Sequence, residues 1–107
     1  MKAANPEPFR IRPERPQEGV VRRNPAILFT DLDDVVVMMD PDKGVYHELN
    51  AVGSEIWRLL ERPRSAEEIC ELVLDEFEVM PETARRDVLA FLNRAFELGI
   101  MTGASAC

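Results

Sequence analysis

The sequence contains few of the residues that build catalytic and metal centres. Histidine occurs once, at His47, and the two cysteines, Cys70 and Cys107, lie too far apart for a metal-binding or redox motif. His47 and Glu48 form half of a metalloprotease-like pair, but the second histidine at helical spacing is missing. No glycine-rich phosphate loop is present. We therefore expect a non-catalytic protein that holds neither a metal nor a cofactor.

Long hydrophobic runs are also absent. No stretch approaches the roughly 18–20 apolar residues that a transmembrane helix needs, and the N-terminal stretch MKAANPEPFRIRPERP has no apolar signal core. Cys70 falls within a helical pattern, where we expect a small buried apolar residue. These features predict a cytoplasmic protein with no membrane partner.

Negative charge dominates the chain, with a formal net charge of -7, but it is unevenly distributed. Residues 1–25 carry six basic and three acidic residues, a net charge of +3, whereas the rest of the chain carries a net charge of -10. A domain this acidic repels a phosphate backbone. We expect a partner that is neutral or basic where it touches the domain, and not a nucleic acid.

Proline separates an N-terminal arm from the rest of the chain. Four of the eight prolines lie within the first 16 residues, so this stretch cannot form a helix and has little to bury. We predict a flexible, basic, Pro-rich arm over residues 1–18, which is either a tether for a partner or a solvated tail. The remaining length fits one domain, predicted over residues 19–102, followed by a loose tail over residues 103–107.

The first half of the domain is predicted to fold as three short strands. An Asp-Asp pair between the first two fits a tight hairpin, and a Pro-Asp-Lys-Gly turn separates the second from the third. Such short connections imply an antiparallel meander. In chain order the strands are AILFTDL (26–32), VVVMMD (35–40) and VYHEL (45–49).

The second half is predicted to contain three helices. Asn50 can cap the first helix directly after the third strand, and Ser65 with Glu68 forms a capping box for the second. The third helix starts at Pro81, ends near Leu98 and is followed by a glycine C-cap. The predicted fold class is therefore α+β: a three-stranded antiparallel β-meander followed by three helices, like a winged helix-turn-helix.

Gly53 lies in the first turn of the first helix, where glycine costs about 1 kcal/mol relative to alanine. A close backbone contact at this position would explain its presence. After the third helix, Ile100 and Met101 are expected to fold back onto the core.

The third helix is more apolar than a helix packed on one side needs to be. The surplus indicates a hydrophobic groove beside the core, although a third helix buried over a wide arc would give the same pattern. The two neighbouring stripes are Ala84, Val88, Phe91, Ala95 and Leu98, and Arg85, Leu89, Leu92 and Phe96.

The strand at 45–49 is an edge strand if the three strands pair in chain order. Its unpaired N–H and C=O groups would then be a template for an added strand. It contains no proline and one acidic residue, Glu48, that discourages pairing. An exposed edge permits either a monomer or a strand-mediated dimer.

In combination, four stretches resemble the PqqD-like family, the peptide-recognition elements of ribosomally synthesised and modified peptides. The resemblance covers about residues 20–101, and the chain is more similar to the small standalone proteins of lasso-peptide clusters than to the pyrroloquinoline-quinone chaperone. The Pro-rich arm has no counterpart. The stretches are RRNPAI (22–27), VVVMMDPDKGVYHELNAVGSEIW (35–57), SAEEI (65–69) and DVLAFLNRAFELGIM (87–101).

The resemblance implies a protein that binds the leader of a precursor peptide as an added strand and delivers it to a modifying enzyme. In lasso pathways these enzymes are a leader peptidase and then a cyclase. Tyr46, His47 and Trp57 are expected to frame the docking corner, unless Trp57 belongs to the core. The predicted peptide-binding residues are Val45, Tyr46, His47, Glu48 and Leu49 for backbone pairing, and Arg85, Arg86, Leu89, Leu92 and Phe96 for the groove.

Two other functions stay open at this point. In a winged-helix DNA-binding regulator, the third helix would be the recognition helix, but the acidic domain opposes this. A chaperone or carrier for a radical SAM peptide-modifying enzyme is the other alternative, which the family also contains. Salt-sensitive DNA binding would favour the regulator, and co-purification with an iron–sulfur enzyme would favour the carrier.

Overall fold

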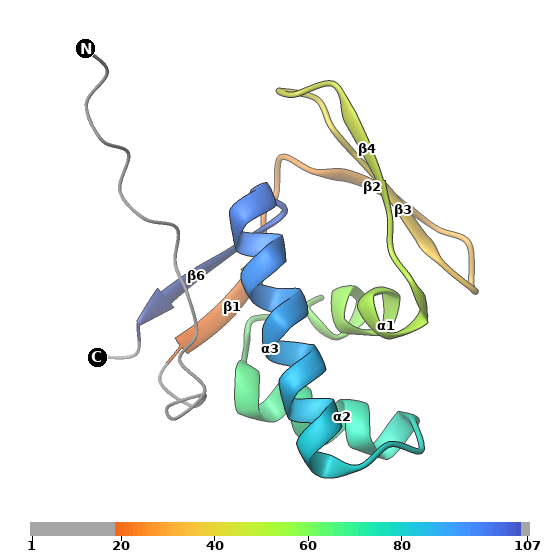
Figure 1. The fold of residues 1–107 in the computed structure, drawn as a ribbon. Coiled ribbons are helices and arrows are strands. Elements are labelled where there is room, and N and C mark those ends of the chain that lie inside the picture. Colours follow the sequence, from red (N-terminus) through yellow and green to blue (C-terminus); the bar gives the residue numbers. More distant parts are fainter. Residues whose placement is uncertain (1–18, 106–107) are drawn as a thin grey trace.

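A computed structural model describes residues 19–105, which form two three-stranded antiparallel sheets and three helices (Figure 1). The strand orders are β2-β3-β4 and β5-β1-β6. The predicted α+β meander followed by three helices is confirmed. The elements are β1 (Gly19–Arg23), β2 (Leu28–Asp31), β3 (Val36–Asp40), β4 (Val45–Glu48), α1 (Ala51–Leu59), β5 (Arg64–Ser65), α2 (Ala66–Glu76), α3 (Pro81–Leu98) and β6 (Met101–Ser105).

The β2-β3-β4 sheet is the predicted meander, and short turns set its register. The amide of Leu32 donates to the carbonyl of Val35 at 2.9 Å, which closes the hairpin between β2 and β3. Asp33 occupies the left-handed region with φ 72°, a conformation that aspartate tolerates better than most residues. The Asp-Asp hairpin is therefore confirmed.

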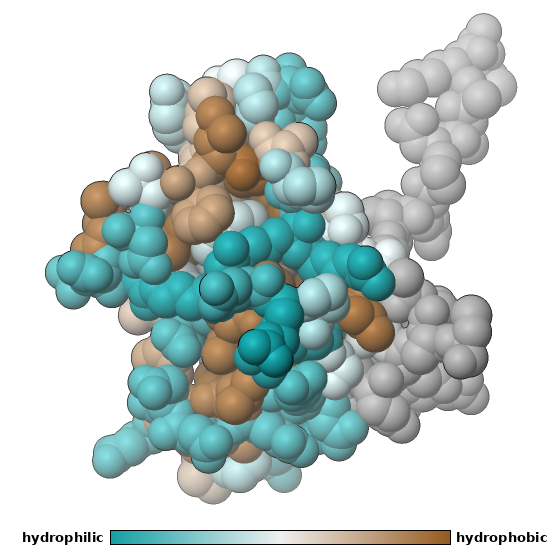
Figure 2. All heavy atoms as spheres, turned by 180° about the vertical axis from the view of Figure 1, so that it is seen from behind, coloured by the Kyte–Doolittle hydropathy of each residue, from teal (hydrophilic) through white to brown (hydrophobic). Residues whose placement is uncertain are grey.

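The helices cover only one face of this sheet. On the covered face, Val36 and Met38 of β3 are buried. On the opposite face, Leu28 and Tyr46 are 58% and 73% exposed. Seen from behind, hydrophobic residues reach the surface over this sheet, in the upper part of Figure 2. The sheet thus projects from the body of the domain as a thin wing with two open edges, β2 and β4.

Local capping defines the ends of the helices as the sequence predicts. The Asn50 side chain accepts a hydrogen bond from the Gly53 amide at 2.7 Å, and the Ser65 hydroxyl accepts one from the Glu68 amide at 3.1 Å. Pro81 opens α3, and Gly99 ends it in the left-handed conformation with φ 79°. These caps are confirmed.

The β5-β1-β6 sheet was not predicted. Its central strand, β1, pairs with β5 just before α2 and with β6 after α3. The prediction of a loose tail is wrong for residues 103–105, because they pair with residues 19–21 of β1. Residues 106–107 and the predicted arm over 1–18 lie outside the described residues. The expectation that Ile100 and Met101 fold back is confirmed, since each is 1% exposed.

The core lies between the helices and the inner faces of both sheets. Its largest fully buried side chains include Trp57 and Ile56 of α1, Ile69 of α2 and Leu92 of α3. Trp57 packs edge-on against Phe29 at 5.3 Å between ring centroids, and the guanidinium of Arg23 stacks on both rings. Within residues 19–105, no helix has the length and hydropathy needed to cross a membrane.

Candidate peptide-binding site

Strand β4 lies at the open edge of the wing. The sheet order confirms that the strand predicted at residues 45–49 is an edge strand, and within residues 19–105 it pairs with β3 alone. Val45, Tyr46 and Glu48 are exposed, and His47 is half-buried. A row of backbone groups along β4 is therefore accessible from the side.

The register identifies which backbone groups face outward. The Leu49 amide donates to the Val36 carbonyl at 2.9 Å, so this residue points its backbone toward β3. Because direction alternates along a strand, the N–H and C=O groups of Glu48 and Tyr46 point away from β3. The free edge thus offers two donors and two acceptors at the spacing of a partner strand.

One side of α3 lies toward this edge. The Phe91 ring packs against Gly53, where an added Cβ atom would approach Phe91 Cε1 to 2.8 Å. One end of the same side is tied to the β3–β4 turn, because Lys43 Nζ donates to the Leu98 carbonyl at 3.0 Å. Phe91, Arg94 and Leu98 recur at helical spacing on this side. The close contact expected at Gly53 is confirmed.

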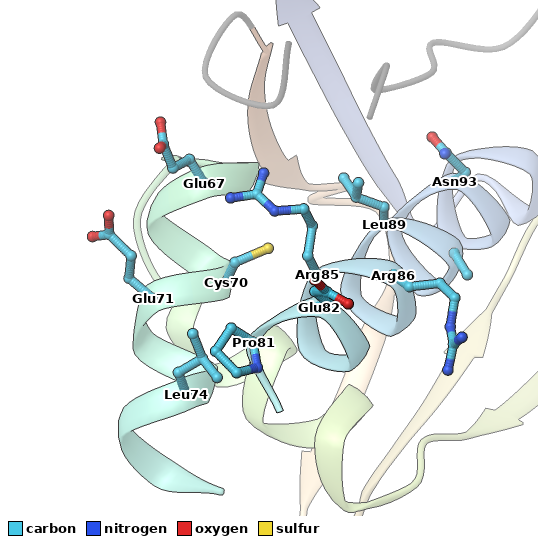
Figure 3. A pocket seen from close by; sticks show the side chains of 11 residues that line it. Glu67, Cys70, Glu71, Leu74, Pro81, Glu82, Arg85, Arg86, Leu89 and Asn93 are labelled. Carbon is cyan, nitrogen blue, oxygen red and sulfur yellow. The ribbon is translucent and has the colours of Figure 1, made fainter. Parts of the chain in front are cut away.

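The opposite side of α3 faces α2. A pocket of about 500 Å³ lies between these two helices, as Figure 3 shows, and Arg85, Arg86 and Leu89 line it. Its α2 wall includes Cys70, and burial raises the pKa of this thiol. The expectation of a small, largely buried Cys70 is confirmed, because the residue is 4% exposed.

The structure therefore does not bring the two predicted halves of the site together. The residues predicted on β4 lie on one strand, although Leu49 is 7% exposed and belongs to the core. Of the predicted groove residues, Leu92 and Phe96 are buried in the core, and Arg85, Arg86 and Leu89 line the pocket with α2. The physical reason is the rotation of α3 about its axis. Val88 points into the core, so the predicted stripe lies on one side of Val88 and Phe91 lies on the other.

Phe91, Arg94 and Leu98 were not predicted as site residues. The sequence contains one signal for this side of α3, which is Gly53 in a helical first turn. A glycine there indicates a bulky neighbour, but only the structure shows that the neighbour is Phe91.

The predicted docking corner of Tyr46, His47 and Trp57 is not formed. Trp57 is 1% exposed and belongs to the core, which was the stated alternative. Tyr46 and His47 point to opposite faces of β4, with His47 on the inner face beside Met38. Among the described residues, neither His47 Nε2 nor Trp57 Nε1 has a hydrogen-bond partner although both atoms are buried.

An ion pair fastens the β2 side of the wing to α1. Arg58 donates to both carboxylate oxygens of Asp31, at 2.8 and 2.9 Å, and to the Asp33 carbonyl at 2.7 Å. The hydrogen bonds from Arg58, followed by the one from the Asp33 amide, lower the pKa of Asp31 to about 2. This anchor holds the wing at the edge remote from β4.

Potential metal ligands do not converge in the part of the chain that the structure describes. No group of three His, Cys, Asp or Glu side chains there is arranged to hold a metal ion.

Comparison with known proteins relates the chain to peptide-binding proteins. The family model of coenzyme PQQ synthesis protein D (PqqD) matches residues 36–101. Among solved structures, TbiB1 in complex with the TbiA(beta) leader peptide is 34% identical, with a TM-score of 0.70 over 75% of this chain and 93% of that one. Lasso peptide synthetase B1 complexed with the leader peptide is 29% identical, with a TM-score of 0.65 over 76% and 95%. A search of curated proteins finds no match. Since the family model covers more than half of the sequence, the chain belongs to the PqqD family.

Proposed function

We propose that this protein binds the leader segment of a ribosomally synthesised precursor peptide and delivers it to a modifying enzyme, in a lasso-peptide pathway a leader peptidase. The observation that carries the proposal is the open edge of β4, next to α3, in a chain 34% identical to a protein solved with a leader peptide. The protein itself supplies no catalytic group in this proposal, and it works in the cytoplasm, where precursor peptides are made.

The leader adds to the wing as a fourth strand. The outward backbone groups of Tyr46 and Glu48 pair with the leader backbone, and such bonds do not depend on its side chains. Each backbone hydrogen bond contributes about 1 kcal/mol net. Several of them, together with burial of apolar side chains, are enough for a micromolar complex of about 8 kcal/mol.

The side of α3 that faces β4 supplies side-chain recognition. Phe91 and Leu98 are half-buried and offer apolar contact area to alternate residues of an added strand. Arg94 is exposed on this side and would meet an acidic leader residue.

Binding acts through effective concentration. A leader held on β4 keeps the attached core peptide close to an enzyme that recognises the complex, which raises its local concentration to the millimolar range for a short flexible linker. The reaction itself belongs to that enzyme.

Fluorescence anisotropy with a synthetic leader tests the proposal. The probe is a labelled peptide from the short reading frame beside the gene, titrated with the full chain at two salt concentrations. We expect saturable binding that persists at moderate salt and is lost with a scrambled leader. Binding of duplex DNA with a steep salt dependence, and of no leader, would instead support the regulator.

A proline substitution separates strand addition from other modes of binding. Glu48→Pro removes an outward N–H group and leaves the bonds between β3 and β4 intact, because an edge strand tolerates proline on its open side. Leaving one leader carbonyl unpaired costs about 1–3 kcal/mol, so we expect a loss of roughly 5- to 150-fold in affinity. Glu48→Ala is the matched control and should bind nearly as the parent does. Equal affinity of the two variants would contradict strand addition at this edge.

A further inference from the structure

The pocket between α2 and α3 is not used by the proposed leader site. Figure 3 shows that the facing sides of the two helices form its walls, with Cys70 on α2 opposite Arg85 on α3. Its volume is about 500 Å³, and Leu74, Pro81 and Leu89 contribute an apolar lining. A pocket of this size and composition can receive several side chains of another molecule.

Apolar side chains continue from this pocket onto the surface, at the connection between the two helices. Val79 is 41% exposed and Met80 is 71% exposed, and Met80 directly precedes Pro81, which lines the pocket. Met80 is the N-cap of α3 but makes no side-chain hydrogen bond to the helix, whereas serine or aspartate at this position would stabilise it. Large exposed apolar side chains beside a pocket are typical of a surface that another protein covers.

The charges around the pocket are divided between its two walls. Glu67 and Glu71 line it from α2. Arg85 and Arg86 line it from α3, where Glu82 is the one acidic lining residue. Figure 3 shows the charged ends of Glu67, Glu71 and Arg86 pointing away from the pocket, where another molecule can reach them.

These charges are not neutralised within the chain. Glu67, Glu71 and Arg85 form no ion pair within residues 19–105, and Arg86 forms one exposed pair with the next residue, at 3.6 Å. A basic partner would be attracted by the α2 wall and repelled by the α3 wall, and the reverse holds for an acidic partner. The pocket therefore suits a partner that carries both charges on separate walls.

A second copy of the same surface has this distribution of charge. In an isologous interface, each surface contacts itself across a two-fold axis. If the axis lies in the interface and bisects the angle between the helices, α2 of one copy lies over α3 of the other, so each acidic wall meets a basic wall. If the axis instead runs along α2, this helix lies over its own copy and acidic residues oppose one another. Charge complementarity favours the first arrangement.

The positions along the two helices agree with this arrangement. Leu74 and Pro81 are the lining residues nearest the connection, at the corner where α2 and α3 meet (Figure 3). From this corner, Glu71 lies about 4.5 Å along α2 and Arg85 lies about 6 Å along α3, at 1.5 Å per residue. A two-fold axis through the corner therefore brings Glu71 of one copy close to Arg85 of the other.

We propose that two copies of this chain associate through the α2–α3 surface, with Met80 and the apolar lining near the two-fold axis and Glu67 and Glu71 paired with Arg85 and Arg86 of the second copy. The β4 edge lies on the other side of α3, so both β4 edges stay open in this dimer, unlike in a dimer that pairs through β4. The inference stands whether or not the leader proposal holds, because its tests contain no leader peptide.

Sedimentation velocity of the full chain measures this association. The chain has a mass of 12.2 kDa, and we expect the average mass to rise toward twice that value as protein concentration increases. Salt at about 150 mM weakens the long-range repulsion between two acidic copies, since the screening length is then about 8 Å. A mass that stays at that of one chain up to about 1 mM protein would overturn the proposal.

Removal of the exposed methionine tests the apolar contact. Met80→Ser takes away the apolar side chain and supplies a hydroxyl that can cap α3, so the fold should keep or gain stability in thermal melts. We expect the dimer dissociation constant to rise roughly tenfold or more. Leu28→Ser makes a similar change at a 58% exposed position of the wing and is the matched control, with an unchanged constant expected. A dimer weakened by Leu28→Ser and not by Met80→Ser would overturn the proposal.

Charge reversal tests the pairing of the two walls. Glu67→Lys/Glu71→Lys makes both walls predominantly basic, and Arg85→Glu/Arg86→Glu makes both acidic. Each variant alone should dimerise about tenfold or more weakly. An equimolar mixture of the two variants should form a heterodimer, a recovery that damage to the fold would not produce. A mixture that stays monomeric would contradict the pairing.

Two controls locate the contact. Asp75→Lys/Glu76→Lys changes the same charge at exposed α2 positions outside the pocket. This variant should dimerise as the parent does and form no heterodimer with the acidic variant. Glu48→Pro, at the β4 edge, should also leave the dimer intact. A dimer that is lost in Glu48→Pro and survives both charge reversals would place the contact at β4 and overturn the proposal.

Discussion

The two sides of α3 differ in what lies opposite them. On one side, Phe91 and Leu98 face the start of α1 and the turn before β4, next to a strand edge with unpaired backbone groups. On the other side, Arg85 and Leu89 face α2 across a pocket with an acidic rim. The first side offers a surface next to a strand edge, whereas the second offers a pocket between two helices.

The difference shows that a helix with two apolar stripes can present two distinct surfaces without a larger core. Val88, Leu92 and Ala95 between the stripes are each at most 1% exposed, so the helix is anchored along its middle. Sequence alone assigned the peptide to the stripe of Arg85 and Leu89, because both stripes have similar hydropathy. The choice between them depends on which side β4 occupies.

The largest expected effect comes from pushing α3 away from α1. Gly53→Val places methyl groups where an added Cβ atom already lies 2.8 Å from Phe91 Cε1. We expect the free energy of unfolding to fall by about 1–3 kcal/mol, as for other overpacked sites, and leader affinity to fall with it. Urea denaturation measures the first quantity and anisotropy the second. Ala51→Val, on an exposed position of the same helix, should change stability by less than about 1 kcal/mol.

Charge reversal compares the two sides directly. Arg94→Glu should weaken binding of a leader that places an acidic residue opposite this side chain roughly fivefold, equivalent to about 1 kcal/mol, because exposed charge pairs contribute little more. Arg86→Glu makes the same charge change on the other side, where the Arg86 side chain is 76% exposed, and should leave leader affinity unchanged. If anisotropy titrations showed a larger loss of leader affinity for Arg86→Glu than for Arg94→Glu, the leader would bind on the α2 side of α3 instead.

A smaller effect is expected at the end of the leader site. Lys43→Met removes the ammonium group that donates to the Leu98 carbonyl at the C-terminus of α3. We expect a loss of about 0.5 kcal/mol in stability and a change of roughly twofold in leader affinity, because the turn is no longer held to the helix. Lys43→Arg keeps a donor and should restore both values. Identical thermal melts for the two variants would show that this contact does not fasten the turn.

The smallest effect concerns the wing edge remote from the leader. Because the pKa of Asp31 is lowered from 3.8 to about 2 in the folded chain, the unfolded chain takes up this proton first as pH falls. The contribution of Asp31 to stability is therefore present well above pH 3.8 and is lost as pH falls toward 2. Asp31→Asn should flatten the dependence of melting temperature on pH in that window, followed by circular dichroism between pH 2 and pH 6. A slope equal to that of the parent would assign the acid sensitivity to other carboxylates.

Local chemistry explains what could be predicted. The N-caps at Asn50 and Ser65, the Pro81 helix start, the Gly99 cap and the Asp33 turn each depend on bonds within a few residues. Residue type therefore reports these features directly. The edge position of β4 was also predictable, because short turns leave a meander little choice of strand order.

The sequence by itself determined the meander, the three helices and their ends, and the presence of surplus apolar area on α3. Only the tertiary structure decided which side of α3 faces β4, that Trp57 is core, and that β1 joins β5 and β6 in a second sheet. The physical reason is separation along the chain: β1 pairs with residues 64–65 and 101–105, and Phe91 meets Gly53, so these contacts depend on how the whole core packs. A stripe of apolar residues predicts burial or binding, but its partner is set by the rotation of the helix within that core.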